Sequence, residues 1–201
     1  MEIGKATIGT EHPDYATRLN NVAGLYQQMG RYEEAEPLYL EALEIGKATI
    51  GATHPRYATR LNNLALLYRH MGRYDEAERL FLEALEIDKA TIGTAHPDYA
   101  TDLDNLAGLY HQMGRYQEAE PLVLEALEVH KATIGATHPE YATHLNNFSM
   151  LYEKTARLEQ ALPLIEQALT IWQSTLGETH PYTQTATQNR DRIAAKLATQ
   201  D

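Results

Sequence analysis

Apolar and polar residues follow one another along this chain with the period of an amphipathic α-helix, and the pattern recurs every 42 residues. In the first complete unit one apolar face is formed by Ala16, Leu19, Val22, Ala23 and Tyr26, which are spaced as i, i+3, i+4 and i+7. A second apolar face at the same spacing follows, formed by Ala35, Leu38, Tyr39, Ala42, Leu43 and Ile45. Each unit is therefore predicted to contain two helices, an A helix and a B helix, of roughly 17 residues each.

Proline and glycine mark the ends of these predicted helices. Pro13 suits the first position of an A helix, where a missing backbone N–H costs nothing, and Asp14 in the first turn complements the helix dipole. Gly30 and Gly51 end the A and B helices, because glycine readily adopts the left-handed conformation found after many helices. The same His-Pro pair begins every unit, at residues 12, 54, 96, 138 and 180.

The units are close copies of one another. Residues 12–53 and 54–95 are identical at 31 of 42 positions. We predict four complete units, at 12–53, 54–95, 96–137 and 138–179. Residues 1–9 match the end of a preceding B helix, and residues 180–198 are expected to form one C-terminal capping helix, because Thr187, Arg190 and Asp191 make its outer face polar. Self-similarity at this period indicates an all-α solenoid of stacked helix pairs.

Alanines at fixed places in each unit predict how the helices meet. Ala23, Ala35 and Ala42 recur 42 and 84 residues later, and a methyl group there lets neighbouring helices approach closely. One such pair cannot bury both of its faces, so neighbouring pairs are expected to stack and share a core. In the fourth unit Ala156 replaces the turn glycine, which costs about 1 kcal/mol if that residue must take a positive φ.

Composition narrows the class of protein. A hydrophobic content of 43% is enough for a core, but no apolar run is long enough for a membrane span and the N-terminus is no signal peptide. The absence of cysteine suits a reducing compartment, so a cytoplasmic location is expected. The net charge of −11 argues against a nucleic-acid surface, which requires a basic stripe. Neither nucleic acid nor a membrane is therefore an expected partner.

The segment Leu61–Ile87, LNNLALLYRHMGRYDEAERLFLEALEI, resembles the tetratricopeptide repeat. The matching features are a small residue and a Tyr in the A helix, Gly72 at the turn, and Ala77, Phe81 and Ala84 in the B helix. The 42-residue unit with its HPxYATxLNN lead is similar to the kinesin-light-chain type of this repeat. The resemblance implies a right-handed superhelix whose A helices line a concave groove, and proteins of that type bind short peptides there.

The predicted groove is lined by A-helix residues that face away from the core. These are Thr17, Asn20, Asn21, Gln27, Thr59, Asn62, Asn63, Leu66, Arg69, His70, Asp104, Asn105, His111, Asn146, Asn147 and Met150. An asparagine amide can bond to both the N–H and the C=O of a peptide backbone, so an asparagine ladder could hold an extended chain whatever its sequence. In the alternative, the second-row asparagines (Asn21 and its equivalents) bond across the helix interface instead. Arg18 and Arg60 beside this face, together with Arg69 on it, lead us to expect that the N-terminal half of the groove prefers acidic peptides.

The remaining polar residues suggest no catalytic or metal site. The His-Pro histidines recur once per unit, whereas metal ligands must converge on one ion, so these histidines are expected to cap the A helices. His130 and His144 are interpreted as isolated substitutions without a role. The glutamates of the B helices are expected to form a solvated outer face, because an active site needs unique groups in one place. We expect no cofactor, no metal and no enzymatic activity.

The sequence therefore predicts a protein–protein interaction scaffold that holds an extended peptide or a partner segment in its groove. The alternative is a structural spacer or self-assembling element of a larger protein, which stacks end to end through the half-repeat at residues 1–9.

Overall fold

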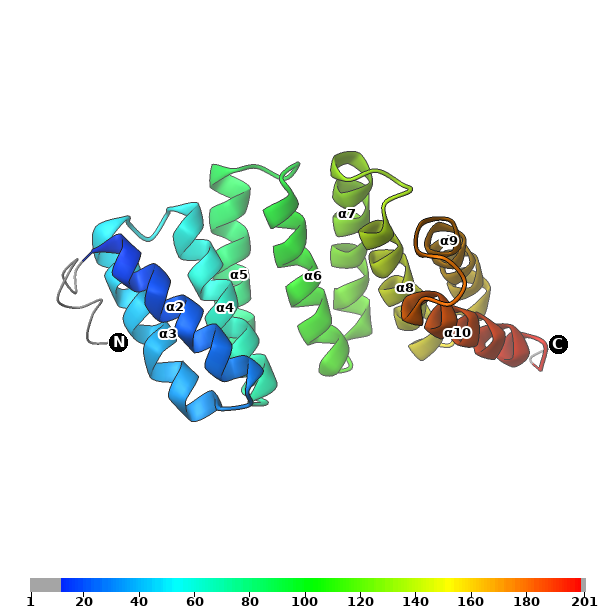
Figure 1. Ribbon diagram of the computed structural model, residues 1–201, viewed down its shortest axis with the longest axis horizontal. Coiled ribbons are helices and arrows are strands. Elements are labelled where there is room, and N and C mark those ends of the chain that lie inside the picture. The colour runs from blue at the N-terminus through cyan, green and yellow to red at the C-terminus, as the bar shows by residue number, and fades with distance from the viewer. Residues whose placement is uncertain (1–11, 200–201) are drawn as a thin grey trace. The chain divides into compact units, whose positions relative to one another are not determined.

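The structure is a computed structural model that describes residues 12–199, so the predicted half-repeat at residues 1–9 lies outside the described residues. Every described element is a helix, as the all-α prediction requires (Figure 1). The chain divides into two compact units after Thr94. The first contains α2 (Pro13–Gln28), α3 (Tyr32–Thr49), α4 (Pro55–His70) and α5 (Tyr74–Thr91). The second contains α6 (Pro97–Gln112), α7 (Tyr116–Thr133), α8 (Pro139–Lys154), α9 (Leu158–Leu176) and α10 (Pro181–Leu197).

Each predicted A helix packs against the B helix that follows it. In the first unit α2 pairs with α3 and α4 with α5, and α3 also contacts α4, so the two pairs are stacked (Figure 1). In the second unit α6 pairs with α7 and α8 with α9, α7 contacts α8, and α10 packs on α9. Among residues 12–199, no helix combines the length and the apolar character that crossing a membrane requires.

The His-Pro histidines cap the A helices, as predicted. At each helix start the histidine Nδ1 accepts a hydrogen bond from the backbone N–H two residues later, as in His54 with the N–H of Arg56 at 3.0 Å. Equivalent bonds form at the other four histidines. The bond satisfies one of the backbone N–H groups that every helix leaves unpaired at its start. At the other end of α8, Ala156 has a φ of 59°, close to the 72–75° of the turn glycines that it replaces.

The predicted alanines lie in the core. Ala23, Ala35 and Ala42 are all fully buried, as are their equivalents in α4 and α5. Around Leu61 the core of the second pair also receives Leu43 from α3, so a helix pair completes its interior with a side chain of the preceding pair. This contact is the physical basis of stacking, because neither pair buries its apolar surface alone.

Arginines that precede the B helices join neighbouring pairs at the surface. The Arg73 guanidinium lies over the Tyr68 ring, 3.9 Å from its centroid, and Nη1 donates to Glu36 of the preceding B helix at 2.7 Å. Arg157 repeats the arrangement, lying over Tyr152 and donating twice to Glu120 at 2.9 and 2.8 Å. Each arginine therefore binds to its own A helix and to the preceding pair.

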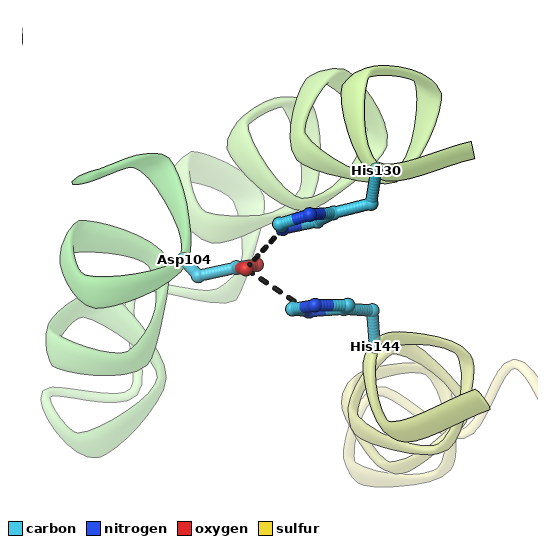
Figure 2. A group of neighbouring side chains, drawn as sticks. All are labelled: Asp104, His130 and His144. Carbon is cyan, nitrogen blue, oxygen red and sulfur yellow. Dashed lines mark hydrogen bonds and ion pairs between the residues drawn. The ribbon is translucent and has the colours of Figure 1, made fainter. Parts of the chain in front are cut away.

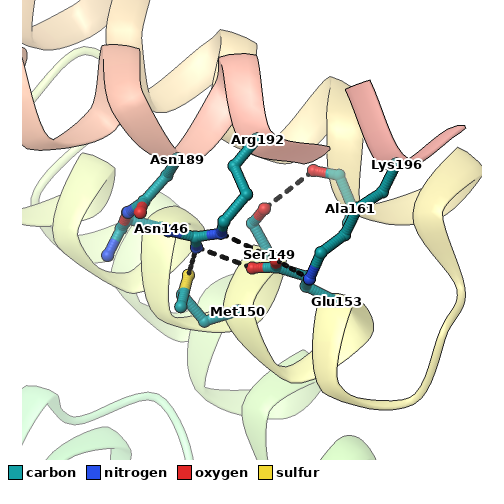
Figure 3. A network of polar contacts seen from close by, with 8 residues as sticks. All are labelled: Asn146, Ser149, Met150, Glu153, Ala161, Asn189, Arg192 and Lys196. Atoms are coloured by element: carbon teal, nitrogen blue, oxygen red, sulfur yellow. Dashed lines mark hydrogen bonds and ion pairs between the residues drawn. The ribbon is translucent and has the colours of Figure 1, made fainter. Parts of the chain in front are cut away.

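Helix α10 is held at the end of the second unit by a buried carboxylate. The Glu153 side chain of α8 is 7% exposed, and it accepts hydrogen bonds from Arg192 and Lys196 at 2.8 Å (Figure 3). These hydrogen bonds lower the pKa of Glu153 to about 2, with the Arg192 bond as the largest cause. Helix α10 is thus attached by charge as well as by the buried Ile193.

Candidate functional site

A pocket in the first unit lies between the two A helices, and we call it the first-unit pocket. Its lining includes five of the predicted groove residues, namely Asn20, Asn21, Gln27, Asn63 and His70. Gly24, Leu25, Gln28 and Tyr39 complete the lining. Tyr39 comes from the B helix α3 and reaches between the A helices, which the helical pattern does not indicate, because Tyr39 lies on the predicted apolar face of its helix. Leu25 is 60% exposed.

A chain of hydrogen bonds crosses the first-unit pocket from one repeat to the next. The Tyr39 hydroxyl donates to Gln27 Oε1 at 2.9 Å, and Gln27 Nε2 donates to His70 Nδ1 at 3.1 Å. Burial lowers the pKa of His70, and the positive charge of Arg69 lowers it further. A neutral His70 is therefore favoured near pH 7, and its Nδ1 is free to accept the bond from Gln27.

The asparagines bond to one another between repeats. Asn63 Nδ2 donates to Asn20 Oδ1 at 3.1 Å, and Asn189 Nδ2 of α10 donates to Asn146 Oδ1 at 3.2 Å (Figure 3). At these two places the second-row amide bonds across the helix interface, which is the alternative that the sequence left open. The Asn20–Asn63 pair keeps the N–H groups of Asn20 and the carbonyl of Asn63 available, whereas Asn146 Nδ2 donates to Asn147 Oδ1 at 3.4 Å. Asn189 belongs to the same row, because it lies 42 residues after Asn147.

Arg60 is largely enclosed, although it lines a hollow with Thr17 and Thr59, and the role in acidic-peptide binding that we expected of it stays a prediction. It is 5% exposed, and its guanidinium fits against Gly46, where a Cβ would come within 2.6 Å of Nη1. Its Nη2 donates to Thr17 Oγ1 at 3.5 Å. Burial lowers the pKa of Arg60, with a smaller contribution from Arg56. Arg60 therefore joins α4 to the preceding pair.

The other predicted residues of the first unit are distributed along the same face. Thr17 and Thr59 are exposed and line a second hollow with Asn20 and Asn21, and each threonine hydroxyl donates to the proline carbonyl one turn earlier. Three residues of α4 lie outside both hollows: Asn62 is buried, and Leu66 and Arg69 are half-buried.

A pocket in the second unit, which we call the second-unit pocket, has a volume of about 220 Å³ and lies between α6 and α8. Four predicted residues line it, namely Asp104, His111, Asn147 and Met150, together with Gly108, His144, Val123 and Leu151. Burial lowers the pKa of His111, with a smaller effect of the Lys154 charge. Of the other predicted residues, Asn105 is half-buried on α6 outside this pocket, and Asn146 bonds to Asn189 at its edge.

Two histidines without an expected role meet at the edge of the second-unit pocket. His130 of α7 and His144 of α8 are stacked with ring centroids 3.7 Å apart, and both face Asp104 of α6 (Figure 2). The Asp104 Oδ2 atom lies 2.9 Å from His130 Nε2 and 3.0 Å from His144 Nδ1. Burial raises the pKa of Asp104, but the hydrogen bonds and charges of the two histidines outweigh it and the net pKa is lowered. The interpretation of these histidines as isolated substitutions is therefore wrong.

The comparisons with known proteins agree on one kind of fold. The family described as Tetratricopeptide repeat matches residues 1–48, 14–90, 57–123 and 98–174. One solved structure is that of a Podosopora anserina protein named as a kinesin light chain, with nearly identical TPR-like repeats. Its TM-score is 0.83 and its sequence identity is 25%, and the match covers 94% of this chain and 89% of that one. A variant of that protein with one substitution gives the same values. The structure of BtubC (BKLC) from P. vanneervenii has a TM-score of 0.75 and 25% identity, and the match covers 92% of this chain and 82% of that one. No curated protein matches.

Proposed function

Since the chain belongs to the tetratricopeptide repeat family, whose members mediate protein–protein interaction, we propose that it binds an extended segment of a partner protein along the face formed by its A helices. The observation that carries the proposal is the first-unit pocket. Apart from Tyr39 of α3, its walls are A-helix side chains, and its polar groups lie beside the exposed Leu25. Polar groups that fix direction beside an apolar contact are what peptide recognition requires.

The amide pairs support binding to a peptide backbone. In the Asn20–Asn63 pair one hydrogen bond is made between the repeats, and donors on Asn20 and an acceptor on Asn63 remain for a ligand. The internal bond fixes both side chains before binding, so less conformational entropy is lost when a peptide arrives.

The pocket-lining residues are also those that differ between nearly identical repeats. Gly24 of the first-unit pocket is equivalent to Gly108 and Met150 of the second-unit pocket, and Gln27 is equivalent to His111. Side chains that differ on a repeated face give each repeat its own preference for a partner residue. We therefore propose binding rather than catalysis as the function, and a reducing compartment such as the cytoplasm as the place.

The test fills the first-unit pocket without disturbing the fold. A Cβ at Gly24 would meet only the Tyr39 hydroxyl, at an ordinary 3.5 Å, so Gly24→Leu should fold well and reduce the pocket. Peptides that bind the wild-type chain, selected from a peptide array, would be measured by fluorescence anisotropy. We expect Gly24→Leu to weaken the peptides that contact the first unit at least about tenfold, which is about 1.4 kcal/mol.

The control variant is Lys47→Leu, which adds the same side chain on an exposed part of α3. Affinity should be unchanged in this control. Equal losses in both variants, or no loss in Gly24→Leu for any selected peptide, would contradict binding at the first-unit pocket.

The second candidate function is end-to-end assembly, and the exposed apolar side chains of α2 favour it. Leu25 and Met29 are 60% and 64% exposed and lie one turn apart. Assembly predicts that the apparent molar mass from light scattering rises with protein concentration in the wild-type chain and not in a Leu25→Asn/Met29→Lys variant. A mass that stays at one chain over the whole range of concentration would exclude it.

A further inference from the structure

The cluster formed by Asp104, His130 and His144 is unlike any other group of side chains in the structure. Within residues 12–199, it is the one group of three histidine or acidic side chains whose donor atoms lie within 4.8 Å of one another. The three residues come from three successive helices, α6, α7 and α8, and their polar atoms converge (Figure 2). We propose that these three residues form a binding site for a divalent transition-metal ion of the zinc type.

At each of these three positions the residue is found in no other repeat of the chain. The position of Asp104 holds an asparagine in the other three repeats, namely Asn20, Asn62 and Asn146. The positions of His130 and His144 are equivalent to those of Gly46 and Arg60, which pack against one another in the first unit. Where the first repeat meets the second, these two positions hold a glycine and an arginine. Where the third repeat meets the fourth, they hold two histidines. The carboxylate that faces both histidines stands where the repeat otherwise has an amide.

The chemistry of the donors selects the ion. Two imidazole nitrogens and one carboxylate oxygen are a common ligand set for Zn²⁺, whereas Mg²⁺ and Ca²⁺ prefer oxygen alone. Three protein ligands leave a fourth tetrahedral position open, as in zinc sites that bind water or an added ligand. Here the open position would face the second-unit pocket, because Asp104 and His144 both line it.

The distances require only a small adjustment. Tetrahedral donors that lie about 2.05 Å from one ion are about 3.3 Å apart. The Asp104 oxygen lies 2.9 and 3.0 Å from the two nitrogens, so those separations would open by a few tenths of an ångström. The two histidine nitrogens lie within 4.8 Å of one another, and the stacked rings would tilt to bring them closer. The ion takes the place of the N–H hydrogens that now point toward the carboxylate.

Burial also favours the ion. The side chains of His130, His144 and Asp104 are 7%, 15% and 28% exposed. Water competes weakly for an ion in such a place, and the carboxylate charge balances part of the ion's charge. The His-Pro histidines provide no comparable site, because each uses Nδ1 to cap its own helix.

The experiment measures Zn²⁺ binding to the full chain after removal of metal with a chelator. Isothermal titration should show one Zn²⁺ bound per chain, and Co²⁺ should give the visible absorption of a tetrahedral complex. Zn²⁺ should raise the melting temperature, because it binds the folded chain. Asp104→Asn, which restores the residue of the other repeats, should weaken Zn²⁺ at least about tenfold.

The decisive variant is His130→Gly/His144→Arg, which copies the Gly46 and Arg60 pair and should therefore fold. It should bind no Zn²⁺ at this stoichiometry and show no metal-dependent melting. His138→Asn removes an exposed imidazole but keeps a capping side chain, so it should bind Zn²⁺ like the wild-type chain. Absence of saturable binding in the wild-type chain, or equal binding by a folded His130→Gly/His144→Arg chain, would overturn the proposal.

Discussion

The attachment of α10 through Glu153 gives the sharpest prediction about stability. Replacing Glu153 with glutamine removes the charge that holds Arg192 and Lys196 and leaves the shape of the side chain unchanged. The pKa of Glu153 falls from 4.5 to about 2 in the folded chain. A shift of that size sets a ceiling of about 3.4 kcal/mol. Solvent at Arg192 and Lys196, which are 42% and 53% exposed, screens the charges, so we expect about 2 kcal/mol.

The effect has a definite pH dependence. A carboxylate whose pKa is lowered by folding stabilises the folded state above its unfolded pKa, and this contribution disappears as the pH falls through the folded pKa. The stability difference between the wild-type chain and Glu153→Gln should be about 2 kcal/mol at pH 7 and less than about 1 kcal/mol at pH 3.

Urea unfolding followed by Trp172 fluorescence measures this directly. Trp172 is the single tryptophan of the chain, it is buried in α9, and its ring lies 5.6 Å from that of Tyr182 in α10. Its emission should therefore report separation of α10 from α9. Glu166→Gln makes the same charge change on an exposed part of α9 and should show neither effect. Equal stability of Glu153→Gln and the wild-type chain at pH 7, or a difference that persists undiminished at pH 3, would refute the reasoning.

Three further substitutions test the local structure by urea unfolding. Ala156→Gly should raise stability by about 1 kcal/mol, because Ala156 has a positive φ that glycine adopts freely, and a lower urea midpoint would contradict this. His138→Ala should cost about 1 kcal/mol through loss of the helix cap, whereas His138→Asn should cost little, and equal losses would argue against capping. Ser149→Ala removes a buried hydrogen bond of 2.9 Å to the Ala161 carbonyl. Because alanine fills this position in the other repeats, the loss of stability should be about 1 kcal/mol or less. A loss above about 3 kcal/mol would contradict this and show that the bond orders the helix pair.

The helices could be read from the sequence because their limits are set locally. The His-Pro pair begins each A helix and a left-handed residue ends it, and neither signal depends on the rest of the fold. The buried alanines could also be predicted, since they repeat at every joint. Tyr15 is buried although the apolar pattern of α2 did not include it, because it lies at the edge of that face and contacts α3 through Ala42.

The contacts between successive helix pairs could be predicted only in part. The helical pattern predicts that Asn20 and Asn63 face outward, and both line one pocket. It does not predict that they bond to each other. The contacts of Arg60 and those of His130 and His144 were not predicted, for a common reason. Their contacts join residues 14 to 43 positions apart, and the register of one helix pair on the next decides which side chains meet. Residues that are far apart in the sequence, such as His130 and His144, can therefore meet where two helix pairs are in contact.

The central claim is that the partner segment binds along the face formed by the A helices. Backbone amide NMR with a selected peptide tests this claim most directly. Addition of the peptide to the ¹⁵N-labelled chain should shift the signals of Asn20, Gly24 and Asn63, on the A helices α2 and α4. The exposed B-helix residues Leu40 and Leu82 should be unaffected. Shifts confined to Leu40, Leu82 and their neighbours, with the first-unit pocket unchanged, would contradict the account.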